Sequence, residues 1–365
     1  MTVKFVSGFE SIIDQKQPLR ILSSLLRNRK IPHALLFTGF EGVGKAAVAR
    51  IFAMACNCST RKAENDRETP DGQAPRLSSV DEKSEIYRDP SSPCGACKSC
   101  RKIETGNHPD IIRVKPSGPF IKIDQIRTLC RTLAMKPYEA RLRVVIISDA
   151  HTMNAPAGNA LLKVLEEPPD QTILVLTALH PSDLLPTVAS RCQHIRFNPI
   201  SRNNLTAKLV DAAGLDPDDA AVITTMANGS YAKALSMTRP GKRGNWIERR
   251  RWLLGEVDAL SSRPTRFQLA FAARLAKDKE ILPDSLEVIK TYLRDLVVAK
   301  YYPEKIINKD LTDKIQYASQ KTSVASLLKK LKDIQTAQKD IDANANLRLA
   351  LEVLMVRLAG SNTDA

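Results

Sequence analysis

Residues 39–45 (GFEGVGK) have the composition and spacing of a loop that binds phosphate groups. Glycines let the backbone turn tightly and direct several N–H groups at one ligand, and a lysine adds positive charge. The pattern G-x-x-x-x-G-K-[S/T] is met except at its last position, where Ala46 replaces the hydroxyl that would hold magnesium. We therefore predict a nucleotide-binding loop, incomplete for magnesium, formed by Gly39, Gly42, Gly44 and Lys45.

Asp149 ends an apolar stretch at the place where a P-loop protein has its magnesium-binding aspartate. In such proteins a glutamate follows and polarises the attacking water. Here the next residue is Ala150, so the expected general base is missing. A general base is typically worth about 10²–10⁴-fold in rate. The residues leave open whether the loop binds nucleotide, and they argue against hydrolysis.

Cys94, Cys97 and Cys100 are spaced by two residues each, so the three thiolates can converge on one metal ion. Tetrahedral zinc needs a fourth ligand; Cys58 is the best candidate, and Cys56, on the apolar side of a helix, is the alternative. An iron–sulfur cluster and free thiols are the other interpretations. Four protein ligands would make a zinc ion structural, without an open position for catalysis.

Arg191 stands in the sequence Ser190-Arg191-Cys192, between a short helix-forming stretch and a strand-like one. An arginine at the end of such a helix can reach a neighbouring subunit and stabilise developing phosphate charge, as an arginine finger does. Judged on this residue alone, an ordinary surface arginine is the simpler interpretation.

The glycine loop, Asp149 and Arg191 belong to a region of alternating strands and helices. Strands are predicted at the apolar runs 34–37, 108–114, 143–148, 172–177 and 193–197. Helical patterns separate them, for example at 121–133 and 159–167. Such alternation predicts an α/β fold, with a parallel sheet covered by helices on both faces.

Two further regions differ in character. Residues 59–93 are charged, rich in Pro, Ser and Asp, and nearly without large apolar side chains, so we predict a solvated, mobile insertion. From residue 199 the composition is helical, with short helices up to 241, a linker at 240–244 and long 3.6-residue periods beyond it.

Composition limits the class of protein. The chain of 365 residues is 43% apolar, has no 18-residue apolar run and shows no signal peptide, so we expect a cytoplasmic protein that does not enter a membrane. Its net charge of +15 favours contact with nucleic acid or an acidic partner, although many cytoplasmic proteins are simply basic. Seven cysteines in that compartment argue against a disulfide framework.

Several motifs together resemble the delta-prime family of bacterial DNA polymerase III clamp-loader subunits, within the AAA+ superfamily. They are the glycine loop, the four cysteines from Cys58 to Cys100, His108-Pro109-Asp110, IKIDQIRTL (121–129), NALLKVLEEPP (159–169), Ser190-Arg191-Cys192 and NANLRLALEVLMVRL (344–358). The resemblance covers nearly the whole chain. It implies three parts: a RecA-like AAA+ domain with a zinc module (58–100) at 1–198, a helical lid at 199–242 and a helical collar at 243–365.

The resemblance also implies a function. Such a subunit works with the gamma/tau motor and delta subunits in a hetero-pentamer, which opens the sliding clamp and places it on primer-template DNA. Basic residues of the ring would follow the duplex backbone through phosphate contacts. The family assigns Arg191 as an arginine finger that acts in trans on ATP of the adjacent motor subunit. The implied cofactors are structural Zn²⁺ and, if bound at all, ATP that is not hydrolysed.

Three departures separate this chain from the ATP-hydrolysing gamma/tau subunits. Ala46 replaces the magnesium-binding hydroxyl, Ala150 the general base, and Ala232 the lid arginine that senses phosphate. We therefore expect no enzymatic activity from the isolated chain. The alternatives are an active gamma/tau-like motor, because Lys45 and the glycines are intact, and a stand-alone zinc-bearing nucleic-acid-binding module.

Overall fold

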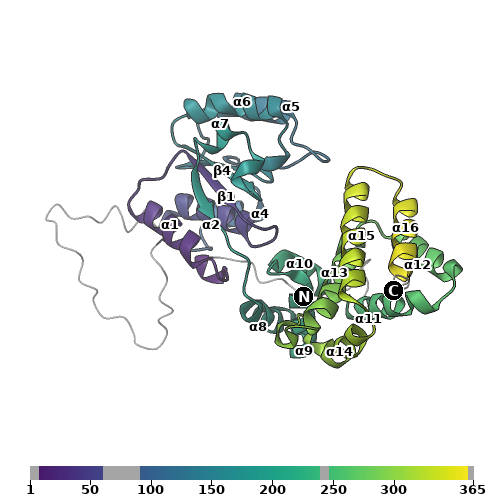
Figure 1. Cartoon of the computed structure of the whole chain (residues 1–365). Coiled ribbons are helices and arrows are strands. Elements are labelled where there is room, and N and C mark those ends of the chain that lie inside the picture. Colours follow the sequence, from purple (N-terminus) through teal and green to yellow (C-terminus); the bar gives the residue numbers. More distant parts are fainter. Residues whose placement is uncertain (1–7, 61–90, 239–245, 361–365) are drawn as a thin grey trace, which may run out of the picture. The chain divides into compact units, whose positions relative to one another are not determined.

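The computed structural model describes residues 8–60, 91–238 and 246–360 (Figure 1). The chain forms two compact units, Met1–Ser201 with Ser230–Ala232 and Arg202–Gly229 with Lys233–Ala365. The expected insertion 59–93, for its residues 61–90, and the expected linker 240–244 lie outside the described residues. The finer division into a domain, a lid and a collar stays a prediction.

A parallel sheet of five strands forms the centre of the first unit. The spatial order is β2-β3-β4-β1-β5, and the strands are β1 Ala34–Thr38, β2 Ile111–Val114, β3 Arg143–Ile147, β4 Thr172–Ala178 and β5 Gln193–Arg196. Every residue of β1, β3 and β4 is buried, because these inner strands are covered on both faces. Leu36 of β1 pairs with Leu176 on one side and with His194 on the other.

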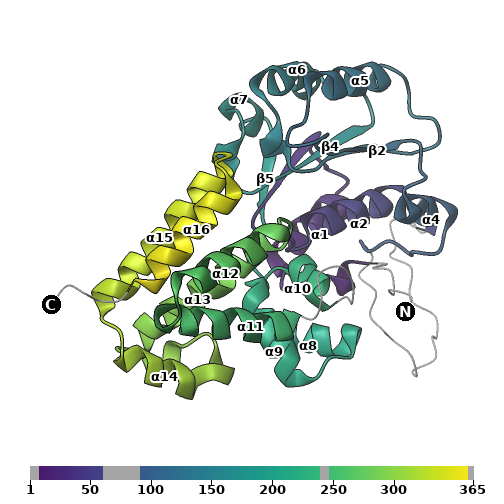
Figure 2. The ribbon, with the colours of Figure 1, turned by 90° about the vertical axis from the view of Figure 1, so that its right-hand side faces the viewer.

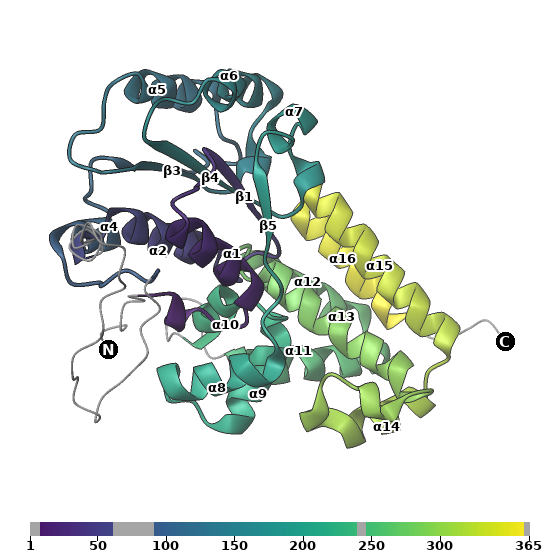
Figure 3. The same cartoon turned by 90° about the vertical axis from the view of Figure 1, so that its left-hand side faces the viewer.

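Helices cover both faces of this sheet (Figure 2, Figure 3). One face carries α1 Lys16–Arg27, α2 Lys45–Asn57 and α4 Lys98–Thr105; the other carries α5 Ile123–Leu133, α6 Ala155–Glu166 and α7 Pro186–Ala189. Side chains alternate along a strand, so Leu35 and Phe37 of β1 enter the first core and Leu36 enters the second. The predicted α/β fold class is confirmed.

The described part of the second unit is entirely helical. Its longer helices are α8 Arg202–Ala213, α9 Pro217–Ala227, α11 Trp246–Ala259, α12 Thr265–Lys277, α13 Leu282–Ala299, α14 Thr312–Gln320, α15 Val324–Asp342 and α16 Leu347–Ala359. Helix α10 (Tyr231–Thr238) begins in the first unit and continues in the second. Helices α15 and α16 lie side by side (Figure 1). No helix among residues 8–60, 91–238 and 246–360 is both long and apolar enough to cross a membrane.

A buried polar network fixes the segment 303–311 inside the second unit; this segment contains two short 3-10 helices, Pro303–Lys305 and Lys309–Leu311. The carboxylate of Asp295, which is fully buried, accepts hydrogen bonds from two backbone N–H groups of this segment and from the Asn308 side chain. Arg250 donates to the Asn308 side-chain oxygen at 2.7 Å and pairs with Asp310 at 2.6 Å. The network thereby joins α11 and α13 to the connection between α13 and α14.

Candidate functional site

The glycine loop lies between β1 and α2, and its three glycines have φ angles of 140°, 75° and 104°. A Cβ on Gly39 would lie 2.4 Å from the Phe197 carbonyl oxygen, and one on Gly42 would lie 2.1 Å from the Ser230 hydroxyl. Both positions therefore need glycine for conformation and for space. At Gly44, which precedes α2, a Cβ would meet nothing within 4 Å.

Lys45 is the first residue of α2, and its ammonium group is bound by its own loop. It is 8% exposed and donates hydrogen bonds to the carbonyl oxygens of Gly39 and, at 2.8 Å, of Phe40. Burial lowers the pKa of Lys45, while the negative charges of Asp149 and Glu41 act in the opposite direction. Two of the three N–H donors of the lysine that would contact a phosphate are thus already bound to backbone carbonyl oxygens.

Asp149 lies just after β3 with an exposed side chain and a φ of 53°. Its backbone N–H donates to the Thr177 hydroxyl at 3.0 Å. The carboxyl ends of parallel strands share one edge, so Asp149 and the glycine loop lie at the same edge of the sheet, and its charge acts on Lys45. The following Ala150 is fully buried and has no group that could polarise water.

Ala232 lies against the glycine loop. Its backbone N–H donates to the Gly42 carbonyl oxygen at 3.3 Å, and its Cβ would be 3.0 Å from a Cβ on Gly42. Ala46, next to Lys45 on α2, is exposed. Ala46 and Ala232, two of the three positions at which the sequence departs from the expected motor motif, therefore lie beside the glycine loop, and each offers only a methyl group there.

Arg191 follows α7 at the surface of the first unit. Its guanidinium group is 2.9 Å from a carboxylate oxygen of Glu166 and donates to the Thr187 carbonyl oxygen at 3.0 Å. The Arg191 side chain is 38% exposed and that of Glu166 is 51% exposed. The arginine therefore rests on contacts within its own unit and remains reachable from outside.

The structure brings Cys58, Cys94, Cys97 and Cys100 together as a candidate metal site. Their sulfur atoms all lie within 4.8 Å of one another, and none forms a disulfide. Tetrahedral zinc with Zn–S bonds of about 2.3 Å needs sulfur–sulfur separations of about 3.8 Å. The four thiols therefore fit such an ion after a small contraction. Cys56, on α2, is buried and is not part of the cluster.

Backbone N–H groups support this cluster, and two helices position it. Cys58 follows α2, Cys97 caps the N-terminus of α4, and Cys100 lies in the first turn of α4. The N–H groups of Cys94, Cys97 and Cys100 point at the preceding sulfur atoms over 3.3–3.5 Å. Such donors stabilise thiolates, which are the form that binds a metal.

The protonation of the cluster follows from these contacts. A hydrogen bond from the Cys100 thiol, together with the Cys94 amide, lowers the pKa of Cys58 to about 3. The pKa of Cys100 is raised because its thiol donates that bond and is buried. Burial acts to raise the pKa of Cys97, but hydrogen bonds from Ser59 and the Cys100 amide lower it overall.

Asp110 has a positioning role that the sequence did not reveal. Its buried carboxylate accepts hydrogen bonds of 2.8 Å from all three backbone N–H groups of residues 138–140 and lies 3.7 Å from the Arg143 guanidinium. Arg143 in turn donates to the Met135 carbonyl oxygen at 2.7 Å. The two residues thus fix the loop between α5 and β3. The sequence signal that could have indicated this contact is an acidic residue, Asp110, just before β2 and a basic residue, Arg143, at the start of the neighbouring strand β3.

Comparisons with known proteins identify the family. A family model described as DNA polymerase III, delta subunit, matches residues 14–86 and 83–201, and one described as its C-terminal part matches residues 244–360. DNA polymerase III subunit delta' of Bacillus subtilis is 27% identical over 348 residues, which cover 94% of this chain and 96% of that protein.

Two further relatives share less. DNA polymerase III subunit tau of Bacillus subtilis is 32% identical over 234 residues, covering 63% of this chain but 37% of the relative. Among solved structures, a DNA polymerase III gamma subunit-related protein of Thermotoga maritima is 19% identical, with a TM-score of 0.40; the match covers 93% of this chain and 98% of that one. The chain therefore belongs to the DNA polymerase III delta-subunit family and is a clamp-loader subunit that resembles delta-prime, as its motifs predict.

Proposed function

We propose that this clamp-loader subunit does not hydrolyse ATP and instead completes the catalytic site of a neighbouring ATPase subunit. The observation that carries the first half is the state of Lys45, whose ammonium group is bound by two carbonyl oxygens of its own loop. A phosphate would have to displace these acceptors, and Ala46 offers no hydroxyl for magnesium.

The other two losses act on the chemical step. Ala150 cannot polarise water, and Ala232 provides no positive charge at the loop. Gly39, Gly42 and Gly44, with Lys45 and Asp149, then serve chiefly to build the fold. The glycines permit the tight turn, and the Lys45 hydrogen bonds close it.

The test of this half is the ATPase rate of the purified chain. We expect the same rate with and without the substitution Lys45→Ala, because the chain lacks the groups that hydrolysis needs. A gamma/tau subunit measured under the same conditions is the positive control. Hydrolysis at a motor-like rate that Lys45→Ala abolishes would instead identify an active motor.

The second half concerns Arg191, for which we propose the role of an arginine finger in trans. Its exposure and its position at the end of α7 support this role, since it can leave Glu166 for a phosphate of another subunit. The positive charge would then stabilise charge that develops on the transferred phosphoryl group. For this role, the guanidinium group of Arg191 has to exchange the Glu166 carboxylate for a phosphate of the neighbouring subunit.

The candidate metal is zinc, held by Cys58, Cys94, Cys97 and Cys100. A tetrathiolate site suits zinc, and backbone N–H groups already stabilise the sulfur atoms. When bound, the ion would supply a structural cross-link with no open coordination position. The four residues would then fix the end of α2 against the start of α4.

The proposed partners are the gamma/tau and delta subunits, the sliding clamp and primer-template DNA, with the cytoplasm as the place of action. Helix α16 supports an assembly role, because Leu349, Val353 and Val356 are 59%, 42% and 43% exposed on one side of it. A helical unit with an unpaired apolar face of this kind is suited to contact other helical subunits.

A further inference from the structure

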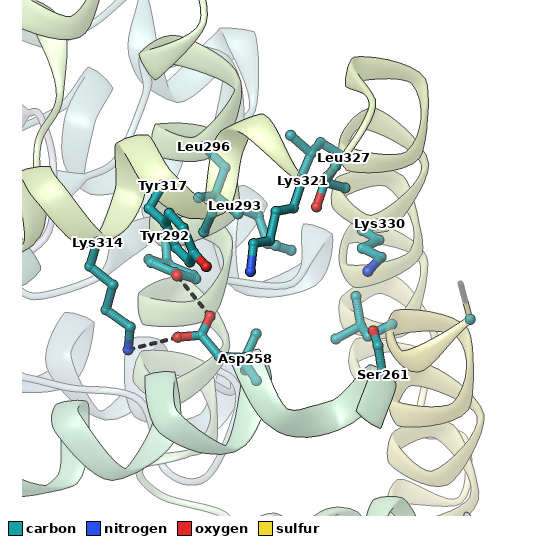
Figure 4. A pocket seen from close by; sticks show the side chains of 15 residues that line it. Asp258, Ser261, Tyr292, Leu293, Leu296, Lys314, Tyr317, Lys321, Leu327 and Lys330 are labelled. Atoms are coloured by element: carbon teal, nitrogen blue, oxygen red, sulfur yellow. Dashed lines mark hydrogen bonds and ion pairs between the residues drawn. The ribbon is translucent and has the colours of Figure 1, made fainter. Parts of the chain in front are cut away.

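A cavity of about 600 Å³ lies within the second unit, between α11, α13, α14 and α15 and beside the end of α16 (Figure 4). Its volume falls in the range of roughly 300–1,000 Å³ that is typical of small-molecule pockets. Buried leucines supply much of its lining, namely Leu293, Leu296, Leu327 and Leu358. An apolar body of small-molecule size would therefore find matching contacts there.

The charges around the cavity are unbalanced, with three lysines and one aspartate. Asp258 is already satisfied, because it pairs with Lys314 at 2.7 Å and accepts a hydrogen bond from the Tyr292 hydroxyl at 2.7 Å. Within the described part of the chain, Lys321 and Lys330 form no ion pair with a carboxylate. Two positive charges thus remain at the cavity without an acidic counterpart.

These two lysines come from different elements and reach into the same space (Figure 4). Lys321 follows α14, and its ammonium group lies 4.1 Å from the centre of the Tyr317 ring. Lys330 lies on α15, and burial lowers its pKa without a nearby acid to offset the effect. A partly desolvated ammonium group beside leucine side chains costs free energy that an anion would recover.

We propose that this cavity binds a small organic anion, with its apolar body against the leucines and its acidic group between Lys321 and Lys330. The acidic group is a carboxylate, sulfonate or phosphate, because each can accept hydrogen bonds from both ammonium groups. The site uses neither the glycine loop nor Arg191, so it is independent of the function proposed above.

The experiment uses the full chain and the fluorescent probe 8-anilinonaphthalene-1-sulfonate, which joins an aromatic body to one anionic group. N-phenyl-1-naphthylamine, which has the same body without the sulfonate, is the neutral control probe. We expect saturable binding of one sulfonate probe per chain. The double substitution Lys321→Gln with Lys330→Gln should weaken it by about tenfold and leave the neutral probe unchanged.

Two single variants locate the effect. Lys329→Gln, on the exposed side of the same helix, should leave binding of both probes unchanged. Ser261→Phe, at an exposed position of the lining, should weaken both by narrowing the entrance. Circular dichroism confirms that each variant is folded. The proposal is overturned if the wild-type chain binds no saturating probe, if the double variant binds it equally well, or if Lys329→Gln causes the same loss.

Discussion

At the scale of single residues, the contacts of the Arg191 guanidinium group contribute little free energy and can be exchanged for others. Its ion pair with Glu166 joins two exposed side chains, and pairs of this kind contribute about 0–1 kcal/mol to stability. Another acceptor, such as a phosphate of a neighbouring subunit, can therefore replace Glu166 at little cost. A buried arginine such as Arg143, bound to several carbonyl oxygens, could not be moved in this way.

The substitution Arg191→Ala should leave the chain folded but lower the DNA-stimulated ATPase rate of the reconstituted loader. An arginine finger raises kcat by about 10³–10⁵-fold at the site it completes. That one ATPase site should therefore lose its activity, while the other sites of the loader keep theirs. Steady-state ATPase assays with the motor, delta and DNA measure this loss. Arg127→Ala, at a 60% exposed position on α5, is the matched control. An unchanged rate for Arg191→Ala would exclude the finger role.

Asp110 allows a prediction about stability. Burial alone would raise the pKa of its carboxyl, but three backbone N–H donors and Arg143 lower it below its ordinary value. The charged form is thus favoured by folding, and its contribution is complete above the unfolded-state pKa of about 3.9 and is lost as the pH falls through the folded-state pKa.

Asp110→Asn should therefore lower the free energy of unfolding by about 1.5–3 kcal/mol at pH 7, because hydrogen bonds to a charged acceptor are lost. The difference from wild type should shrink below about pH 4. Urea unfolding from pH 7 to pH 3 measures both effects. Asp124→Asn, at an 83% exposed carboxylate, should change little. A constant difference between Asp110→Asn and wild type down to pH 3 would contradict the argument.

At the scale of elements, the cysteine cluster joins the end of α2 to the start of α4. Metal analysis of the purified chain should find about one zinc, because the four ligands form one closed site. Replacing Cys97 and Cys100 together by Ser should remove the metal and lower the melting temperature. Cys130→Ser, outside the cluster, is the control and should keep the zinc. A folded chain that carries no zinc would refute this assignment.

The sequence predicted the elements that depend on local pattern. The apolar runs of β1, β3 and β4 are almost unbroken, since both faces of these strands are buried, and the glycines and lysine of residues 39–45 have fixed spacing. The cysteine spacing likewise indicated which thiols converge. Predicting the fourth ligand required a choice between Cys56 and Cys58, and the structure places Cys58 in the cluster.

What the sequence could not predict depends on contacts between distant residues. Asp110 acts on residues 138–140, and Asp295 on Asn308, through backbone N–H groups that carry no sequence signal. The hydrogen bonds of Lys45 depend on the conformation of carbonyl groups within its loop. The positive charge of the cavity beside Lys330 arises because Asp258 pairs with Lys314, and this pairing cannot be read from the sequence.

At the scale of the whole molecule, assembly is the property to test. The double substitution Leu349→Asp with Val353→Asp should reduce co-purification with the motor and delta subunits, because it places charges on the exposed apolar side of α16. Leu328→Asp, at a 54% exposed leucine of α15, is the control. Size-exclusion chromatography of the mixed subunits measures the outcome. Complete assembly of the double variant would show that this side of α16 is not an interface.

The hydrogen bonds of Lys45 have a consequence for how the subunit responds to its surroundings. A protein that binds a ligand only when folded gains stability as the ligand concentration rises. We expect a glycine loop whose lysine is held by its own carbonyl oxygens to gain no such stability, so the melting temperature of the chain should stay the same when ATP is added. The stability of this subunit would then be independent of the ATP concentration, unlike that of a subunit that binds the nucleotide.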